Sequence, residues 1–195
     1  MNNKKYSGYI IGALLVLVGL FLIITFNSLV KKEEKVKVQW AEVQNAYQRR
    51  LDLIPNLVNT VKGNANFEQN ILQNIAGARA SAINKTTSDI VAKNYNEQLA
   101  AQDNLAIAAN QLIINVEKYP DLQGTKAFVT LQTQLERTEL RIKTARKDFN
   151  ESIQLYNSST RSFPTSMVAK LFGFNTKDGF LSVAGADKAT EIKFK

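Results

Sequence analysis

The sequence predicts an all-α protein, in which an N-terminal transmembrane helix is followed by an antiparallel up-down four-helix bundle with long helices. Three observations support this prediction. An uncharged apolar run near the N-terminus is long enough to cross a bilayer, later apolar residues recur every three or four positions, and polar or proline-containing stretches separate these repeats. We therefore expect a signal-anchor helix in residues 1–30, one helical bundle domain in residues 31–180 and a flexible polar C-terminal tail in residues 181–195.

The transmembrane prediction rests on the segment from Gly8 to Phe26, which contains no charged residue. A bilayer core about 30 Å thick requires about 20 helical residues, so this segment is long enough to hold the chain in the lipid bilayer. A cleaved secretory signal is the alternative, but such a signal has a shorter apolar stretch that ends at a small-residue cleavage site. Lysines flank both ends of the segment, so their distribution leaves the side of the soluble domain undecided.

The first amphipathic helix is expected to continue out of the membrane. Its apolar stripe runs from Val36 through Trp40 to Ile54. We expect this helix to break near Asp52–Pro55, because the residue before a proline is disfavoured in the α conformation and proline is tolerated in a first turn. A kinked but continuous helix is the alternative. The second helix would then carry one apolar face, made of Val58, Val61, Ala65, Leu72, Ile75 and Ala82.

The third helix is expected after a polar stretch in which Thr87 or Ser88 is a candidate cap. Its apolar stripe consists of Tyr95, Leu99, Leu105, Ala109, Leu112, Ile113 and Val116. A loop at Tyr119–Gly124 leads to the fourth helix, where large residues recur every seven positions, as in a coiled coil: Phe128, Leu135, Ile142, Phe149 and Tyr156. Long helices joined by short connections are typical of an up-down-up-down bundle.

Composition excludes several kinds of chemistry. The chain has no cysteine and no histidine, which excludes thiolate nucleophiles, Ser-His-Asp hydrolysis and histidine-ligated metals. It also lacks the glycine-rich loops that bind nucleotides, so we expect no cofactor. The net charge of +8 favours anionic lipid headgroups, but no basic stripe interleaved with aromatic residues predicts a nucleic-acid partner. The composition does not exclude an enzyme that uses only carboxylate side chains.

The helical frames also place charged residues on apolar faces. Arg50 falls on the apolar face of the first helix, and Glu68 and Arg79 fall on that of the second. A buried charge requires an ion-pair or hydrogen-bond partner, so we expect these residues either to have partners across the bundle or to lie at its frayed ends. We interpret these residues as a polar layer that fixes helix register, and a ligand or catalytic site is the alternative.

Two blocks of the sequence resemble the signature of the LemA family. The first consists of Arg49–Val58, Val61–Gly63, Glu68 and Ala78–Arg79, and the second of Tyr119–Pro120, Leu135–Glu139, Arg141–Ile142, Ala145–Arg146, Phe149–Asn150, Tyr156–Asn157, Phe163–Pro164 and Phe172–Phe174. The chain departs from the family pattern at Asn64, where an aromatic residue is usual, and at Phe67, where a histidine is usual. No role of that histidine is carried over to this chain.

The resemblance implies a single-pass protein of the bacterial cell (inner) membrane, with a long-helix bundle outside the bilayer and no established biochemical activity. It also selects candidate polar or interaction positions: Arg50, Asp52, Asn56, Glu68, Arg79, Glu136, Glu139 and Arg141. For Glu139 the alternative is an ordinary exposed helix pair with Lys143, four residues later.

We expect a non-enzymatic interaction or scaffolding module that binds a protein partner or self-associates. One alternative is a carboxylate-dependent enzyme, or a regulatory subunit of a membrane enzyme, that uses Glu68 with Asp52 or Glu139. Another is a membrane-shaping assembly.

The segment Phe163–Phe174 has two interpretations of its own. It is expected either to cap the bundle or to place aromatic side chains among lipid headgroups, with Phe172, Phe174 and Phe180 as the inserted residues.

Overall fold

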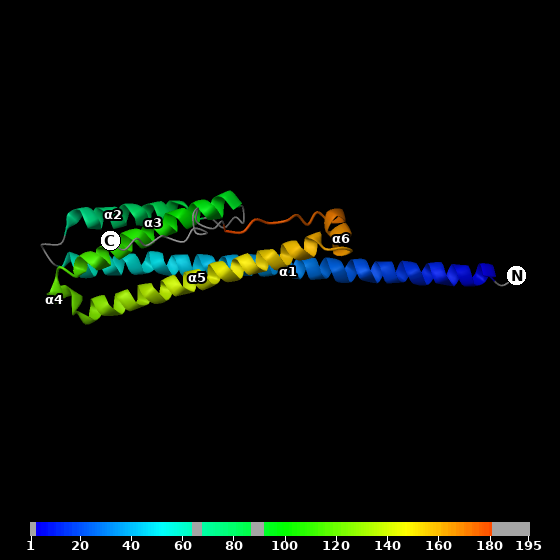
Figure 1. The fold of residues 1–195 in the computed structure, drawn as a ribbon, viewed down its shortest axis with the longest axis horizontal. Coiled ribbons are helices and arrows are strands. Elements are labelled where there is room, and N and C mark those ends of the chain that lie inside the picture. Colours follow the sequence, from blue (N-terminus) through cyan, green and yellow to red (C-terminus); the bar gives the residue numbers. More distant parts are fainter. Residues whose placement is uncertain (1–2, 64–67, 87–91, 181–195) are drawn as a thin grey trace, which may run out of the picture. The chain divides into compact units, whose positions relative to one another are not determined.

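A computed structural model describes residues 3–63, 68–86 and 92–180. Every regular element among these residues is a helix, and none is a strand. The helices are α1 (Asn3–Lys62), α2 (Gln69–Asn84), α3 (Ala92–Val116), α4 (Pro120–Gln123), α5 (Lys126–Arg161) and α6 (Thr165–Leu171) (Figure 1). The expected cap at Thr87 or Ser88 and the predicted tail at residues 181–195 lie outside the described residues.

α1 is one continuous helix of 60 residues that contains Pro55 in its interior. The predicted break near Asp52–Pro55 is therefore wrong, and the continuous alternative is right. Because the chain does not start a new helix at Pro55, the second helix, α2, begins only at Gln69. A proline inside a helix removes one backbone hydrogen bond, and α1 accommodates this loss through a side chain of α2.

The N-terminal part of α1 meets the requirements for a membrane span by length and composition. It belongs to the one helix, among the described residues, that is long and apolar enough to cross a bilayer. Large apolar side chains from Tyr9 to Ile24 are exposed along it, as the lipid-facing surface of a single span would be.

The chain forms two compact units, which share α1 and α5. Unit 1 contains Met1–Gln44 and Thr144–Lys177, and unit 2 contains Asn45–Lys143 and Asp178–Lys195. In unit 2, α2 packs along α3 (Figure 1). One hydrophobic core in this unit takes side chains from α1, α2, α3, α4 and α5, including Leu57, Ile75, Leu105, Leu122 and Phe128.

Unit 1 packs α1 against α5 through residues at heptad spacing. Val36 and Val43 are buried on α1, and Phe149 and Tyr156 are buried on α5. The ring of Trp40 lies 5.4 Å from that of Phe149, measured between centroids. Trp40 is therefore a packing residue, as the helical spacing predicts.

The predicted stripes of the third and fourth helices are confirmed. All five large residues at seven-residue spacing in α5 are buried, and so are the stripe residues of α3 except the half-buried Ile113. The predicted loop Tyr119–Gly124 contains a single helical turn, α4, because Pro120 at its first position has the backbone angle that a helix start requires.

The segment after α5 differs from the expectation at Phe180. Val168 and Ala169 of α6 are buried in unit 1. Phe180 instead lies in unit 2, where its ring packs edge-on against Tyr95 at 5.4 Å. Burial, with a smaller contribution from the charge of Asp178, raises the pKa of Tyr95 to about 12. Phe180 is therefore not a headgroup-inserting residue.

Candidate functional site

Arg50 is the central charged residue of the candidate site in unit 2. Its side chain is only 2% exposed. Nη1 donates to the backbone oxygen of Gln102 at 2.8 Å and to its side-chain Oε1 at 3.2 Å. Nη2 donates to Oε2 of Glu139 at 2.5 Å, so the guanidinium joins α1, α3 and α5. The prediction that Arg50 faces inward and has partners across the helices is confirmed.

Two glutamines of α3 complete this polar layer. Gln98 and Gln102 are buried one helical turn apart. Among the described residues, Oε1 of Gln98, Nε2 of Gln102 and Nε of Arg50 have no hydrogen-bond partner. Sequence analysis missed both glutamines, although Gln102 lies seven residues after Tyr95 and therefore falls within the apolar stripe of that helix.

Arg79 compensates for the proline inside α1. In a regular helix the carbonyl of Leu51 would accept from the amide of residue 55, but Pro55 has no amide hydrogen. Nε of Arg79 donates to this carbonyl at 3.1 Å. Leu51 is buried, so an unpaired carbonyl there would cost about 1–3 kcal/mol. The half-buried Arg79 therefore has a structural role that explains why α1 continues through Pro55.

Glu68 does not lie on an apolar face. It is exposed before the first residue of α2, and its Oε1 lies 3.3 Å from Nζ of Lys118. The predicted inward position is wrong, because the frame counted from Pro55 does not extend across the connection between α1 and α2. Glu68 instead lies at a helix end, which was the alternative. An exposed pair of this kind contributes at most about 1 kcal/mol.

The remaining candidate positions lie at or near the surface. Oδ1 of Asp52 accepts from Nε2 of Gln48 at 2.8 Å, and Oε1 of Glu136 accepts from Nε2 of Gln132 at 3.1 Å. Asn56 and Arg141 are exposed. Glu139 is bonded to Arg50, so the simple pair with Lys143 does not describe its environment.

The arrangement gives little support to carboxylate chemistry. The three carboxylates of the enzyme hypothesis have three different partners: Gln48 for Asp52, Lys118 for Glu68 and Arg50 for Glu139. Within the described ranges, no group of three or more acidic side chains is placed to hold a metal ion.

Unit 1 contains a separate polar cluster that sequence analysis found only in part. Nζ of Lys177 lies 2.9 Å from Oε1 of Glu33 and 5.4 Å from the ring centroid of Tyr156. The side chain of Asn157 donates to the Lys177 carbonyl at 2.6 Å and accepts from its amide at 2.9 Å. Burial, and then the charge of Glu33, raises the pKa of Tyr156. This cluster holds the segment after α6 against α5.

Comparison with known proteins identifies the family. A match to the LemA family covers residues 39–194, which is most of the chain. The chain belongs to the LemA family. The resemblance in the two sequence blocks is thus confirmed, and Arg50, Pro55 and Arg79 lie within the region that the family match covers.

Individual relatives of this LemA-family chain are distant. It is 22% identical over 185 residues to magnetosome protein MamQ 2 of Paramagnetospirillum magneticum, which covers 85% of the chain and 68% of that relative. It is 22% identical over 178 residues to magnetosome protein MamQ of Magnetospirillum gryphiswaldense, covering 82% and 65%. Protein LemA of Metamycoplasma hominis is 26% identical over 145 residues, covering 74% and 63%. The chain thus spans about two thirds of the length of these relatives.

Proposed function

We propose that this LemA-family protein is a non-enzymatic, single-pass module of the bacterial cell membrane whose helices bind a protein partner. In this proposal α1 is a retained signal anchor, and the long helices form an antiparallel up-down bundle. The observation that carries it is the continuity of α1. One helix contains both the exposed apolar segment Gly8–Phe26 and core residues of unit 2 such as Leu57. A chain built in this way presents a packed helical surface at a membrane.

The partner-binding surface is proposed to lie on α3. Arg50, Glu139 and Arg79 bond to groups within unit 2, so a partner would contact other residues. Ile107 and Ile114 are both more than half exposed and lie seven residues apart, which places them on one side of α3. Apolar residues at this spacing suit the groove of a partner helix or of a second copy.

The test is chemical crosslinking of the full-length protein in its native membrane, followed by identification of the crosslinked species. The double variant Ile107→Glu with Ile114→Glu places charges on the proposed surface. Val129→Glu makes the same change at an exposed apolar residue of α5 and serves as the matched control. We expect the double variant to lose a crosslinked species that the wild type and the control both retain.

Circular dichroism must show the same helix content in all three proteins, because a folding defect would also abolish binding. Retention of every crosslinked species by the folded double variant would contradict the α3 surface. Absence of any crosslinked species in the wild type would contradict the interaction module itself. An activity of the purified protein that disappears on Glu139→Gln would favour the enzyme hypothesis.

A further inference from the structure

α6 exposes its large apolar residues and buries its small ones. Val168 and Ala169 are buried, whereas Met167 and Leu171 are 65% and 70% exposed. Met167 and Leu171 are four residues apart and therefore share one side of the helix. Phe163, just before α6, is also strongly exposed. A helix side that faces water ordinarily carries polar residues, and clustered exposed apolar side chains mark a contact surface.

Within unit 1, α6 lies beside α1 near the end of the uncharged segment Gly8–Phe26 (Figure 1). The ring of Phe26 packs edge-on against Phe172 at 5.0 Å and against Phe174 at 5.5 Å, measured between centroids. Thr25 and Leu29 are buried on α1 next to this contact. The packing of unit 1 therefore extends into the last turn of the uncharged segment.

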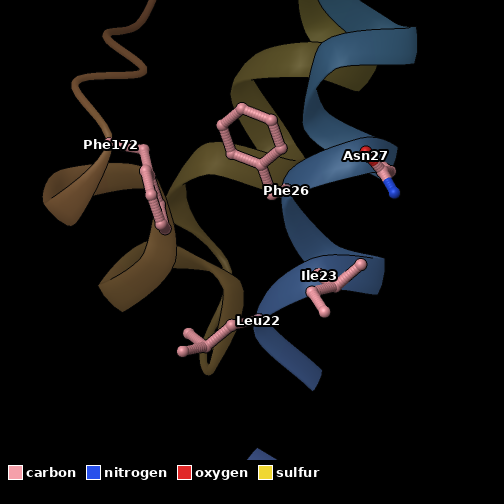
Figure 2. Close-up of a pocket in the computed structure, with 5 residues that line it drawn as sticks. All are labelled: Leu22, Ile23, Phe26, Asn27 and Phe172. Carbon is pink, nitrogen blue, oxygen red and sulfur yellow. The ribbon is translucent and has the colours of Figure 1, made fainter. Parts of the chain in front are cut away.

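A pocket of about 210 Å³ opens at the same place, lined by Leu22, Ile23, Phe26, Asn27 and Phe172. Figure 2 shows the Phe172 ring, from the residue after α6, facing the Phe26 ring of α1. Asn27 supplies the one polar side chain of the lining, at the end nearest the flanking lysines. Such a lining accepts hydrocarbon and offers little to a polar ligand.

We propose that α6 is a lipid-contacting element, in which phospholipid acyl chains of the bilayer cover Met167 and Leu171 and fill the pocket beside Phe26. This inference rests on the membrane anchor of the proposed function. It adds a second membrane contact, made by a segment more than 130 residues away from the anchor in sequence.

The position of the pocket along α1 favours lipid, rather than a protein partner, as its occupant. Leu22, in the pocket lining, lies nine residues before Lys31, or about 13 Å along the helix at 1.5 Å per residue. The pocket thus lies on the bilayer side of the first flanking lysine. Interfacial helices bury their apolar side about 5–10 Å into the boundary between headgroups and acyl chains. The Asn27 and Phe26 end of the pocket, four to five residues before Lys31 and so about 6–8 Å along the helix, lies within this range.

The basic residues around α6 are also consistent with a position at the membrane surface. Lys170 in α6, Arg161 at the end of α5 and Lys31 in α1 are all exposed in unit 1. Apolar residues flanked by basic ones are typical of a surface that contacts acyl chains and anionic phosphates together.

The experiment uses single-cysteine variants of the full-length chain, which has no native cysteine. Met167→Cys tests α6, Leu15→Cys tests the anchor away from the pocket, and Val129→Cys is an exposed control in unit 2. Each variant is labelled with an environment-sensitive fluorophore and reconstituted into vesicles of phosphatidylcholine and phosphatidylglycerol, with or without phospholipids that carry a quencher on the acyl chain. We expect quenching at Met167→Cys to reach at least about half of that at Leu15→Cys, with almost none at Val129→Cys.

The outcomes separate this inference from the proposed function. Quenching at Leu15→Cys without quenching at Met167→Cys would overturn the lipid contact of α6 and leave the anchor standing. No quenching at either position would overturn both. Rapid disulfide formation between copies of unlabelled Met167→Cys, with no lipid quenching of the labelled protein, would overturn the inference in favour of a second copy as the occupant.

Discussion

Units 1 and 2 differ in which unusual side chains they contain and in whether those side chains are buried or exposed. Unit 2 buries a charged residue, Arg50, and contains a proline inside a helix, yet Glu139, Gln102 and Arg79 supply partners for both features from within the unit. Unit 1 leaves large apolar residues of α6 exposed and buries smaller ones. Polar groups that are paired internally indicate a self-contained core. Unit 2 also exposes apolar residues such as Ile107 and Ile114, but only the exposed residues of α6 lie next to a contact with the uncharged segment of α1, which favours lipid as their surroundings.

The two members of the Arg50 pair are not equivalent. Arg50 is 2% exposed, whereas the Glu139 side chain is 44% exposed and can be hydrated without its partner. Removing the Glu139 carboxylate leaves the positive charge of Arg50 buried without a partner. Removing the Arg50 guanidinium leaves the negative charge of Glu139 in contact with water. The comparison between the units therefore predicts an asymmetry that mutations can measure.

The largest effect is expected for Glu139→Ala, because Arg50 then stays buried without an anionic partner. We expect the free energy of unfolding to fall by about 3 kcal/mol. Arg50→Met should cost only about 1 kcal/mol, since it leaves the neutral Gln102 side chain without a donor. Urea unfolding of the full-length protein in detergent micelles, followed by circular dichroism, measures both changes. Equal losses for the two variants would show that Arg50 is not the desolvated partner.

The next effect concerns Arg79 and the proline inside α1. Arg79→Met removes the donor to the Leu51 carbonyl and should cost about 2 kcal/mol. In a Pro55→Ala background the restored amide can donate to this carbonyl, so the same change should cost less than about 1 kcal/mol. Unfolding of the four proteins of this double-mutant cycle supplies the coupling energy. If the two substitutions are additive, Arg79 does not compensate for Pro55.

A smaller effect is expected in unit 1 from Asn157→Ala, which removes both hydrogen bonds to the Lys177 backbone. The released groups can bind water, so the cost should be about 1 kcal/mol. The segment after α6 should then be cleaved faster by trypsin at Lys177. Asn157→Asp keeps the acceptor for the Lys177 amide and should give an intermediate rate. Unchanged cleavage in both variants would exclude Asn157 as the residue that holds this segment.

The smallest effect on folding is expected for Met167→Ser combined with Leu171→Ser. Other parts of the protein do not bury these side chains, and detergent can cover them in the folded and the unfolded protein alike, so the free energy of unfolding in micelles should change by less than about 0.5 kcal/mol. The matched change Val168→Ser, at a buried position of the same helix, should cost about 2 kcal/mol. A loss at the exposed pair as large as that at Val168 would mean that α6 packs in the opposite orientation.

Local periodicity was sufficient to predict most helices. The seven-residue spacing in α5 and the stripe of α3 identify buried residues because apolar side chains on one face must pack against a neighbour. The inward position of Arg50 followed from the same count. Phe180 could not be placed in this way, since its position depends on the direction taken by an irregular segment after α6.

Features that depend on distant partners were not predictable. The sequence rule for proline is correct locally, but the donor that keeps α1 intact comes from Arg79, 28 residues beyond Leu51. Glu68 was assigned to the wrong position because the second helix was expected to begin at Pro55, and its apolar face was counted from that residue. Lys177 and Glu33 have no periodic signal, since one of them lies in an irregular segment.

The most direct test of the contrast between the units is lipid photo-crosslinking of the unmodified full-length protein. Vesicles containing phospholipids with a photoreactive group in the acyl chain are irradiated, and the modified peptides are identified by mass spectrometry. We expect adducts in the segment Gly8–Phe26 and in α6, and none at the exposed residues Ile107 and Ile114 of α3. Adducts on α3 at the same frequency as on α6, or adducts confined to Gly8–Phe26, would contradict the assignment of α6 as a lipid-contacting element.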